Sequence, residues 1–448
     1  MRVNWAGAMV LVVGMKKSGL ASAQLLAGLG ARVRATDLKP LAELGEAAEV
    51  LERLHIPFAI QTPAVFENCD AIVLSPDVPA DLAPLEAARK RGANIIGEVE
   101  LAAPFLKGKI IGVTGSNGKT TTTSLIGHIL REAGLAVQVG GNIGTPATAM
   151  IATSRADGWS VLELSSFQLE TIRDFHAHIG LALNVTQNHL DRHHTFENYA
   201  AAKARLFENM TARDFAVLNA DDPMTVGYAR GTQAAVEWFS GTRAVERGAY
   251  LDGETLVLDG RPLMNAGEIP LRGRHNVENV LAGSIAAARA GVSHEAIAAA
   301  VPTFHAVEHR LEFVRSLNGI DFYNDSKATS VDATLKALDA FPGGLWVILG
   351  GKDKGLDFSA LREPLARKAR AALLIGAAAP KLAAQLNGAV PLVESGTLEA
   401  AIRHGFSNGR AGDTVLLAPA CASFDQFRSF EHRGEVFKEI VNQLGRDN

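Results

Sequence analysis

The sequence contains few cysteines, no excess of positive charge and no long hydrophobic run. Its 448 residues include two cysteines, Cys69 and Cys421, which cannot build the disulfide framework of a small secreted domain. A reducing compartment, the cytoplasm, is therefore expected. The net charge of −4 argues against a general nucleic-acid-binding protein, which would carry a large basic excess.

No uninterrupted apolar stretch approaches the ~20 residues that a membrane span requires. The apolar segment Met9–Val13 resembles the core of a signal peptide, but Gly14-Met15-Lys16-Lys17 ends it too soon, and we interpret it as a strand. Hydrophobic residues make up 47% and charged residues 21% of the chain, which is typical of globular proteins. The length is too great for one core and favours about three domains.

A glycine-rich segment, Ile110–Thr121, is the most informative part of the chain. An apolar run ends in glycines, which are followed by Lys119 and Thr120. Backbone amides in such a loop can surround a polyphosphate, a lysine can neutralise it, and a threonine can bind Mg²⁺. Val113 stands where the usual pattern has its first glycine, and the alternative is a tight strand-to-helix turn that binds nothing. We favour an ATP site.

Strand and helix patterns alternate over the first hundred residues. Met9–Val13 and the segment 31–36 are predicted strands, and Asp37 ends the second, where a dinucleotide-binding fold contacts a ribose. The glycines are Gly14 and Gly19 rather than G-x-G-x-x-G, which weakens the case for NAD. A nucleotide-shaped ligand and a purely structural unit both remain open.

The central part repeats this alternation, and it predicts polar residues at the ends of parallel strands. Glu163 ends the predicted strand Ser160–Leu164, and His189 follows Ile179–Val185. Because carboxyl ends of parallel strands share one edge of a sheet, both residues are expected on the side of Lys119. Glu163 could bind Mg²⁺ or could cap the helix that follows.

Two further histidines, His193 and His194, lie close behind His189. A structural zinc site is not expected there, because no cysteine is near and adjacent histidines cannot surround one ion. The alternative to a function is a surface loop with incidental histidines. The segment 235–271 is expected to add short strands.

Three more buried strands are predicted at 345–349, 372–375 and 414–417. The polar loops Asn324–Thr329, Gly350–Lys354 and Pro419–Asp425 follow strands, and each could bind an anionic substrate or be a plain turn. Cys421 lacks a recognisable histidine partner, so we interpret it as a buried structural cysteine. The predicted fold is α/β with three domains: a Rossmann-like domain (1–107), a P-loop-type ATPase domain with a parallel sheet and extra short strands (108–308), and a second Rossmann-like domain (309–448).

Taken together, these motifs make the chain resemble the Mur ligase family, the ATP-dependent amide-forming enzymes of peptidoglycan precursor synthesis. The resemblance runs nearly end to end, and its last two segments are more specific to the D-glutamate-adding members. The segments that carry it are Gly112–Thr121, Gly141–Gly144, Leu162–Leu169, Asn184–Arg192, Arg272–Val280, His309–Glu312, Asn324–Thr329 and Pro419–Phe430.

The resemblance implies a role for individual residues. The ATP-binding positions would be Gly115, Ser116, Asn117, Gly118, Lys119, Thr120, Thr121, Asn276, Asn279, Arg310 and Asp325. Mg²⁺ would be bound by Thr120, Glu163 and His189, and also by Lys203 once it is carbamylated, which converts an ammonium into a carboxylate-like ligand. Without the resemblance, Lys203 would be taken for an exposed helix lysine. The residues implied to be catalytic are Lys119, His189, Lys203 and Arg310.

The resemblance also implies two substrates, UDP-N-acetylmuramoyl-L-alanine and D-glutamate. The sugar nucleotide would contact Gly14, Asp37, Asn142 and Ser165. D-glutamate would contact Lys327, Thr329, Lys354, Ser423 and Phe430. The chain departs from the family pattern at Met15-Lys16-Lys17, near the uracil contacts, and at Asn188, where an acidic residue often precedes the histidine.

The implied enzyme joins the two substrates at the expense of ATP, with no nucleic acid and no membrane span, as a cytoplasmic monomer. The alternatives are another amino-acid ligase of the superfamily, including one that resembles folylpolyglutamate synthase, a non-catalytic nucleotide-binding regulator, and an NAD-dependent oxidoreductase.

Overall fold

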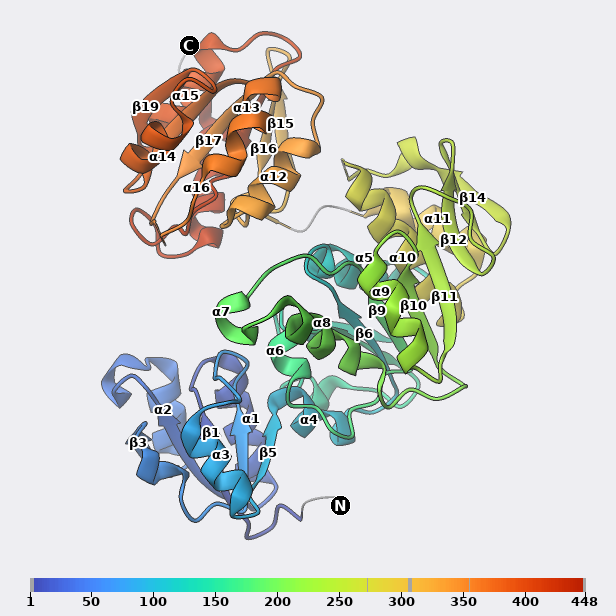
Figure 1. Ribbon diagram of the computed structural model, residues 1–448, viewed down its shortest axis with the longest axis vertical. Coiled ribbons are helices and arrows are strands. Elements are labelled where there is room, and N and C mark those ends of the chain that lie inside the picture. The colour runs from blue at the N-terminus through green and yellow to red at the C-terminus, as the bar shows by residue number, and fades with distance from the viewer. Residues whose placement is uncertain (1–3, 272, 305–307, 354, 446–448) are drawn as a thin grey trace. The chain divides into compact units, whose positions relative to one another are not determined.

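The computed structural model describes residues 4–271, 273–304, 308–353 and 355–445, which form three sheets with helices between their strands (Figure 1). The fold is α/β, as predicted. The chain divides into two compact units: Met1–Glu268 with Val277–Phe304, and Ile269–Asn276 with His305–Asn448. The boundaries proposed from the sequence, 107/108 and 308/309, stay predictions. Among the described helices, none has the length and apolar character to cross a membrane.

The N-terminal sheet has five parallel strands in the order β3-β2-β1-β4-β5. The strands are β1 (Met9–Val13), β2 (Arg32–Asp37), β3 (Phe58–Ile60), β4 (Ala71–Leu74) and β5 (Asn94–Gly97), and the helices are α1 (Lys17–Gly28), α2 (Glu46–Arg53), α3 (Ala83–Lys90) and α4 (Glu98–Ala102). Leu26 of α1 and Leu51 of α2 belong to one core cluster, and Leu85 of α3 belongs to another. Helices on both faces make this a Rossmann-like sheet.

The central sheet has nine strands in the order β14-β13-β12-β11-β10-β9-β6-β8-β7. The strands are β6 (Lys109–Thr114), β7 (Val137–Gly141), β8 (Trp159–Glu163), β9 (Ile179–Ala182), β10 (Phe215–Asn219), β11 (Ala235–Ser240), β12 (Gly248–Asp252), β13 (Thr255–Leu258) and β14 (Arg261–Asn265). The helices are α5 (Lys119–Glu132), α6 (Ser166–Leu169), α7 (Leu190–His193), α8 (Phe196–Ala204), α9 (Pro223–Tyr228), α10 (Arg274–Arg289) and α11 (His294–Ala300). Strands β6 to β12 pair in parallel, whereas β13 and β14 add an antiparallel edge. These edge strands are the extra short strands expected at 235–271.

The C-terminal sheet has six strands in the order β15-β16-β20-β17-β18-β19. The strands are β15 (Glu312–Leu317), β16 (Ile320–Asn324), β17 (Leu345–Gly350), β18 (Ala369–Ile375), β19 (Leu392–Gly396) and β20 (Thr414–Leu417), and the helices are α12 (Val331–Asp339), α13 (Arg362–Lys368), α14 (Ala379–Leu386), α15 (Leu398–Asn408) and α16 (Phe430–Gln443). Only β15 runs antiparallel to its neighbour. Leu338 and Leu365 pack in one core cluster, and Ile402 and Phe437 pack in another, so helices cover both faces here too.

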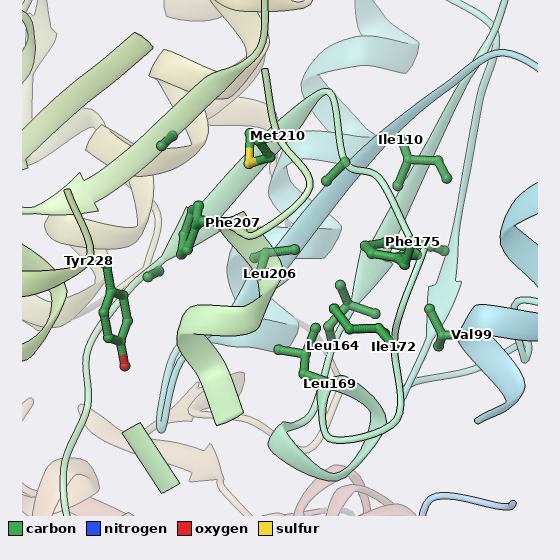
Figure 2. Close-up of a cluster of buried hydrophobic side chains, with 14 of the residues drawn as sticks. Val99, Ile110, Leu164, Leu169, Ile172, Phe175, Leu206, Phe207, Met210 and Tyr228 are labelled. Atoms are coloured by element: carbon green, nitrogen blue, oxygen red, sulfur yellow. The ribbon is translucent and has the colours of Figure 1, made fainter. Parts of the chain in front are cut away.

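A large apolar core supports the middle of the central sheet (Figure 2). Leu206 and Phe207 come from the turn after α8, and Ile110 comes from β6. Gly112 of β6 is part of this fit, since a Cβ there would lie 2.8 Å from a methyl carbon of Leu206. Strand β6, which leads into the glycine-rich loop, is therefore supported by close packing against Leu206.

Two buried glutamates of α4 tie this short helix to the central sheet. Glu98 accepts hydrogen bonds from the backbone N–H and the hydroxyl of Thr148, at 2.6 and 2.8 Å, and burial raises its pKa. Glu100 accepts from three successive backbone N–H groups, those of residues 173, 174 and 175, at 2.9, 2.9 and 3.0 Å. The segment between the first two sheets is thus anchored by carboxylates rather than left as a loose linker.

We expect Glu100→Ala to destabilise the first unit. The substitution leaves three backbone N–H groups without their acceptor, and unpaired groups of this kind cost about 1–3 kcal/mol each when buried. Because the loop is partly accessible, a loss of about 2–4 kcal/mol in the free energy of unfolding is expected, measured by urea unfolding with circular dichroism. Glu43→Ala, at an exposed position, is the control. An unchanged urea midpoint for Glu100→Ala would contradict the anchoring role.

Candidate functional site

The glycine-rich loop connects β6 to α5, at the carboxyl edge of the central sheet. Gly118 precedes α5 with φ +82°, a left-handed conformation that favours glycine. A Cβ at this position would lie 2.4 Å from the side-chain oxygen of Asn279. Thr122 of α5 donates to the same oxygen at 3.2 Å. The loop therefore needs glycine at 118 both for its backbone conformation and for its contact with α10.

The loop is held in place by groups from the neighbouring strand β9. Asn184 lies just after β9, and its backbone and side-chain oxygens accept from the N–H groups of Ser116 and Asn117, at 2.8 and 2.9 Å. The Ser116 hydroxyl contacts the Tyr199 hydroxyl at 2.9 Å. Asn184 and Tyr199 were not singled out from the sequence. For Asn184, its place directly after a predicted strand was the available signal.

Lys119 folds back over the loop that precedes it. Its Nζ donates to the carbonyl oxygens of Gly115 and Ser116, at 2.9 and 3.2 Å. The ammonium is therefore held where a polyphosphate cradled by the loop would need a counter-charge. Thr120 and Thr121 follow in the first turn of α5 and are both buried.

Glu163 lies beside the loop because β8 is the other neighbour of β6. Its carboxylate is 2% exposed and accepts from the Thr120 hydroxyl at 2.7 Å and from the Asn142 amide at 2.9 Å. The helix-cap alternative for Glu163 is wrong, since Ser165 is the N-cap of α6 and forms a capping box with Gln168. Ser165, a predicted substrate contact, thus uses its hydroxyl in this cap.

Lys203 is 1% exposed, which corrects the reading of the bare sequence as an exposed helix lysine. Its Nζ donates to the carbonyl of Gly115 at 2.9 Å and lies 4.5 Å from the centre of the Tyr199 ring. Burial lowers the pKa of this amine well below its usual value, and the nearby charge of Lys119 acts in the same direction, whereas Glu163 opposes it. Burial thus favours a neutral amine beside the phosphate-binding loop.

The three histidines near residue 190 have different environments. His189 precedes α7 with φ +54°, and its ring packs edge-on against Phe167 with 4.9 Å between the ring centres. His193 is 4% exposed, so the interpretation of His193 as an incidental surface residue is wrong. The side chain of His194 is 67% exposed, as that interpretation expects. Across the described residues, no group of three or more His, Cys, Asp or Glu side chains is arranged to hold a metal ion.

The crevice of the N-terminal sheet opens between β1 and β4. The Ser75 hydroxyl donates to the carbonyl of Gly14 at 2.7 Å, and Gly19 packs so closely on that carbonyl that a Cβ would lie 1.7 Å from it. Asp37 accepts from the Met15 N–H at 2.7 Å. A pocket of about 550 Å³ lies here, and its lining includes Asn142. Asn142 therefore contacts Glu163 and also lines the pocket of the N-terminal crevice.

The three polar loops of the second unit follow neighbouring strands. The loops begin after β16, β20 and β17, which are adjacent in the sheet. The backbone N–H of Lys352 donates to the carbonyl of Ala422 at 2.8 Å, and that of Gly350 donates to Pro419 at 2.9 Å. The three loops therefore lie at one edge of the sheet. Cys421 is fully buried, in agreement with a structural cysteine.

Asp325 is buried at this edge, directly after β16. Its carboxylate accepts from the backbone N–H of Leu311 at 3.2 Å. Burial raises its pKa to about 7, although the charge of Arg310 acts against the rise. Arg310 itself is half-buried. Burial, together with the charges of Arg310 and Lys336, lowers the pKa of His275 to about 4.

Two residues predicted to bind the amino acid lie together in the second unit. The Nζ of Lys327 lies 5.8 Å from the centre of the Phe430 ring. The hydroxyl of Ser423 is buried and has no hydrogen-bond partner among the residues that the structure describes, so it can accept or donate to a ligand. The Thr329 backbone N–H donates to the carbonyl of Lys327 at 2.8 Å. Lys354 lies outside the described residues.

The two asparagines predicted to contact ATP lie on α10 and are buried. Asn279 is in the first unit, beside the phosphate-binding loop, and Asn276 is in the second. The sequence-predicted residues thus fall into two groups. Gly14, Asp37, Gly115–Thr121, Asn142, Glu163, Ser165, His189, Lys203 and Asn279 belong to the first unit, and Asn276, Arg310, Asp325, Lys327, Thr329, Ser423 and Phe430 belong to the second.

Comparison with protein families finds two matching domains in the chain. The model of the Mur ligase middle domain matches residues 113–287, and that of the Mur ligase, glutamate ligase domain matches residues 309–421. The first match contains the phosphate-binding loop, Glu163 and Lys203. The second contains Arg310, Asp325 and Lys327.

Relatives cover almost the whole chain. The protein named UDP-N-acetylmuramoylalanine--D-glutamate ligase in Solibacter usitatus is 73% identical over 98% of both chains. The protein of the same name in Acidobacterium capsulatum is 50% identical over 97% of this chain and 96% of its own. A solved UDP-N-acetylmuramate-alanine ligase from Thermotoga maritima shares the fold, with a TM-score of 0.61 and 18% identity over 97% of this chain and 99% of its own.

The chain therefore belongs to the Mur ligase family. It is accordingly an ATP-dependent enzyme that forms amide bonds in peptidoglycan precursor synthesis, as the sequence resemblance implied.

We expect Asp325→Asn to change how stability depends on pH. The folded-state pKa of about 7 lies above the unfolded value of about 3.9. The folded protein therefore keeps a proton that the unfolded chain loses, and stability falls as pH rises between these two values. Relative to wild type, the thermal midpoint of the variant should rise by roughly 5 °C between pH 4.5 and pH 8. The control is Asp339→Asn, where an exposed carboxylate pairs with Lys368. If the thermal midpoints of Asp325→Asn and wild type differ by the same amount at pH 4.5 and pH 8, the raised pKa of Asp325 is contradicted.

Proposed function

We propose that the chain joins D-glutamate to UDP-N-acetylmuramoyl-L-alanine, with conversion of ATP to ADP and phosphate. The observation that carries the proposal is the hydrogen-bonded series Thr120–Glu163–Asn142. Thr120 belongs to the phosphate-binding loop, and Asn142 lines the pocket of the N-terminal crevice. One buried carboxylate thus links a nucleotide-binding loop to a pocket that suits a second, sugar-linked nucleotide.

The chemistry requires activation of the acceptor carboxylate. A carboxylate is a poor acyl donor, because its oxide cannot leave. Transfer of the γ-phosphoryl group of ATP to the L-alanyl carboxylate gives an acyl phosphate, from which phosphate can leave. The amine of D-glutamate attacks the carbonyl carbon, and the tetrahedral intermediate collapses to the amide after loss of a proton. Lys119 and Arg310 neutralise charge on the phosphoryl group, and removal of such a group typically lowers the rate by ~10²-fold or more.

The residues beside the phosphate-binding loop fit a magnesium ion. Glu163 and the Thr120 hydroxyl present oxygen atoms 2.7 Å apart, and Mg²⁺ prefers oxygen ligands. Thr120, Glu163 and His189 would hold it. When bound, Mg²⁺ neutralises charge on the phosphate oxygens.

Lys203 would become a fourth magnesium ligand after carbamylation. A lysine must lose its proton before its nitrogen can attack CO₂, and burial favours that neutral form. Carbamylation forms an N–C bond, releases one proton and leaves an anionic carbamate. The buried nitrogen beside Gly115 would then carry a carboxylate-like group toward Thr120 and Glu163.

The second unit supplies side chains suited to a dicarboxylic amino acid. Lys327 provides an ammonium next to the Phe430 ring, and Ser423 provides a buried hydroxyl that has no hydrogen-bond partner among the described residues. We infer that Thr329 and Lys354 complete the contacts to D-glutamate. Asp325, Asn276 and Asn279 would bind the ribose and adenine of ATP. The expected cytoplasmic location and monomeric state stay predictions.

The rival functions differ in what they require. Another ligase of the family would use the same loop with a different amino acid. A nucleotide-binding regulator would bind ATP without forming an amide. An NAD-dependent oxidoreductase would have no use for the polar edge of the second unit, and the crevice of the N-terminal sheet lacks the G-x-G-x-x-G turn.

A substrate panel tests the proposal. We expect phosphate release from ATP with UDP-N-acetylmuramoyl-L-alanine to depend on D-glutamate, and to be at least about 100-fold slower with L-glutamate, L-alanine or diaminopimelate. Lys119→Ala should lower kcat by about 100-fold or more, while the sugar nucleotide still binds. ATP binding without amide formation would favour a regulator, and a preference for another amino acid would favour a different ligase.

Carbamylation of Lys203 has its own spectroscopic test. In ¹³C-bicarbonate, the protein should show a carbamate carbonyl resonance that is absent from Lys203→Arg. The signal should grow as pH rises, because only the neutral amine reacts. Lys203→Arg should also lose most of its ligase activity, since a guanidinium cannot become an anionic ligand. A spectrum of wild type without this resonance, recorded on active enzyme, would overturn the assignment.

A further inference from the structure

His193 bridges two short helices through both of its ring nitrogens. Its Nε2 lies 2.9 Å from the hydroxyl of Ser166 in α6, and its Nδ1 lies 3.0 Å from a carboxylate oxygen of Glu170. Because Glu170 can only accept when ionised, Nδ1–H donates to it, and Nε2 of the neutral ring accepts from Ser166. We call the set Ser166–His193–Glu170 the histidine relay.

The histidine relay is anchored at its acidic end. The other oxygen of Glu170 accepts from Arg192 at 2.8 Å, and Arg192 also donates to the carbonyl of Val78 at 2.9 Å. The backbone oxygen of His193 accepts from the amide of Asn198 at 3.0 Å. The end of α7 is therefore fixed to α6, to α8 and to the loop after β4.

One aromatic side chain connects the histidine relay to His189. Phe167, next to Ser166, stacks on the ring of His193 with 5.5 Å between centres and an angle of 24°. The same ring makes a T-shaped contact with His189, with 4.9 Å between centres and an angle of 66°. His189 also adopts φ +54°, an uncommon conformation for a residue with a side chain, so its surroundings must hold it.

We propose that His193 is a positioning residue, which holds His189 toward the magnesium site through the histidine relay and Phe167. The inference rests on the proposed function, because it takes His189 as a metal ligand. His193 itself is not one of the proposed magnesium ligands. The order Ser–His–Glu resembles that of a hydrolase triad, but Ser166 is 3% exposed and lies at the start of a buried helix, where it cannot reach a substrate carbonyl. The histidine relay therefore orients His189 and does not supply a nucleophile.

The neighbouring residue His194 provides a matched control. It lies at the next position of the chain and pairs with Asp81, and both side chains are more than 60% exposed. Such exposed pairs contribute little to stability. Loss of His194 therefore removes an imidazole and a hydrogen bond from the same segment without touching the histidine relay.

The test measures Mn²⁺ binding by electron paramagnetic resonance, in the presence of ADP, and ligase kinetics. Loss of a group that orients a metal ligand typically weakens metal binding or activity by about 10–100-fold. For His193→Ala we expect Mn²⁺ affinity to fall about tenfold or more and the Mg²⁺ concentration for half-maximal activity to rise in parallel. The KM for the sugar nucleotide should change less than about twofold. His193→Gln should recover much of the affinity, because its amide can donate to Glu170 and accept from Ser166.

The results for wild type and for the variants distinguish a failure of the proposed function from a failure of the positioning role of His193. If wild type neither binds Mn²⁺ nor forms amide, the proposed function fails. If wild type does both and His193→Ala matches it, or if His194→Ala is equally impaired, the positioning role is wrong. If His193→Ala fails to fold, the Ser166→Ala variant is used instead, because it keeps the imidazole of His193. If Ser166→Ala has the Mn²⁺ affinity and the thermal midpoint of wild type, the proposal is overturned.

Discussion

The carboxylate of Glu163 is nearly removed from water, and a buried charge persists only where other groups bond to it. Here the partners are a hydroxyl of the phosphate-binding loop and an amide that lines the pocket of the N-terminal crevice. The same charge partly offsets the desolvation of Lys203. The loop, the pocket of the N-terminal crevice and the buried lysine are therefore all connected through this one group.

The parallel pairing of the strands explains how the glycine-rich loop and Glu163 come to lie side by side. Strand β6 has β8 and β9 as neighbours, so the residues that follow these three strands meet at one edge. The glycine-rich loop, Glu163 and Asn184 are those residues. The second unit repeats the principle at β16, β20 and β17. In both units polar loops follow adjacent strands at one edge of the sheet, which is where parallel sheets commonly place their ligand sites.

The sequence predicted the architecture well where its patterns are local. Buried strands such as β1, β4 and β20 are continuous apolar runs, and α5 begins at Lys119 and ends just before Gly134 as expected. Strand β9 is shorter than predicted, because the chain turns after Ala182 so that Asn184 can bond the loop. Strand β3 was missed because it has only three residues, two of them exposed.

Burial of single polar residues could not be predicted in the same way. Lys203 sits in an alanine-rich helix that looks exposed, and only the packing of α8 under the loop shows that it is buried. His193 and His194 are adjacent in sequence, yet one is enclosed by α6 and the other faces solvent. Long-range contacts decide both cases, and the local pattern contains no information about them. The polar loops of the second unit were predictable as loops after strands. The burial of the Ser423 hydroxyl, which has no hydrogen-bond partner among the described residues, was not.

The contact between Gly118 and Asn279 has a consequence for how such sequences can change. The two residues lie far apart in the chain, yet a methyl group at 118 would occupy the space of the Asn279 oxygen. Neither position can drift alone: a larger residue at 118 needs a smaller one at 279, which would also deprive Thr122 of its acceptor. Gly118, Thr122 and Asn279 are therefore expected to vary together across related sequences or to stay as they are.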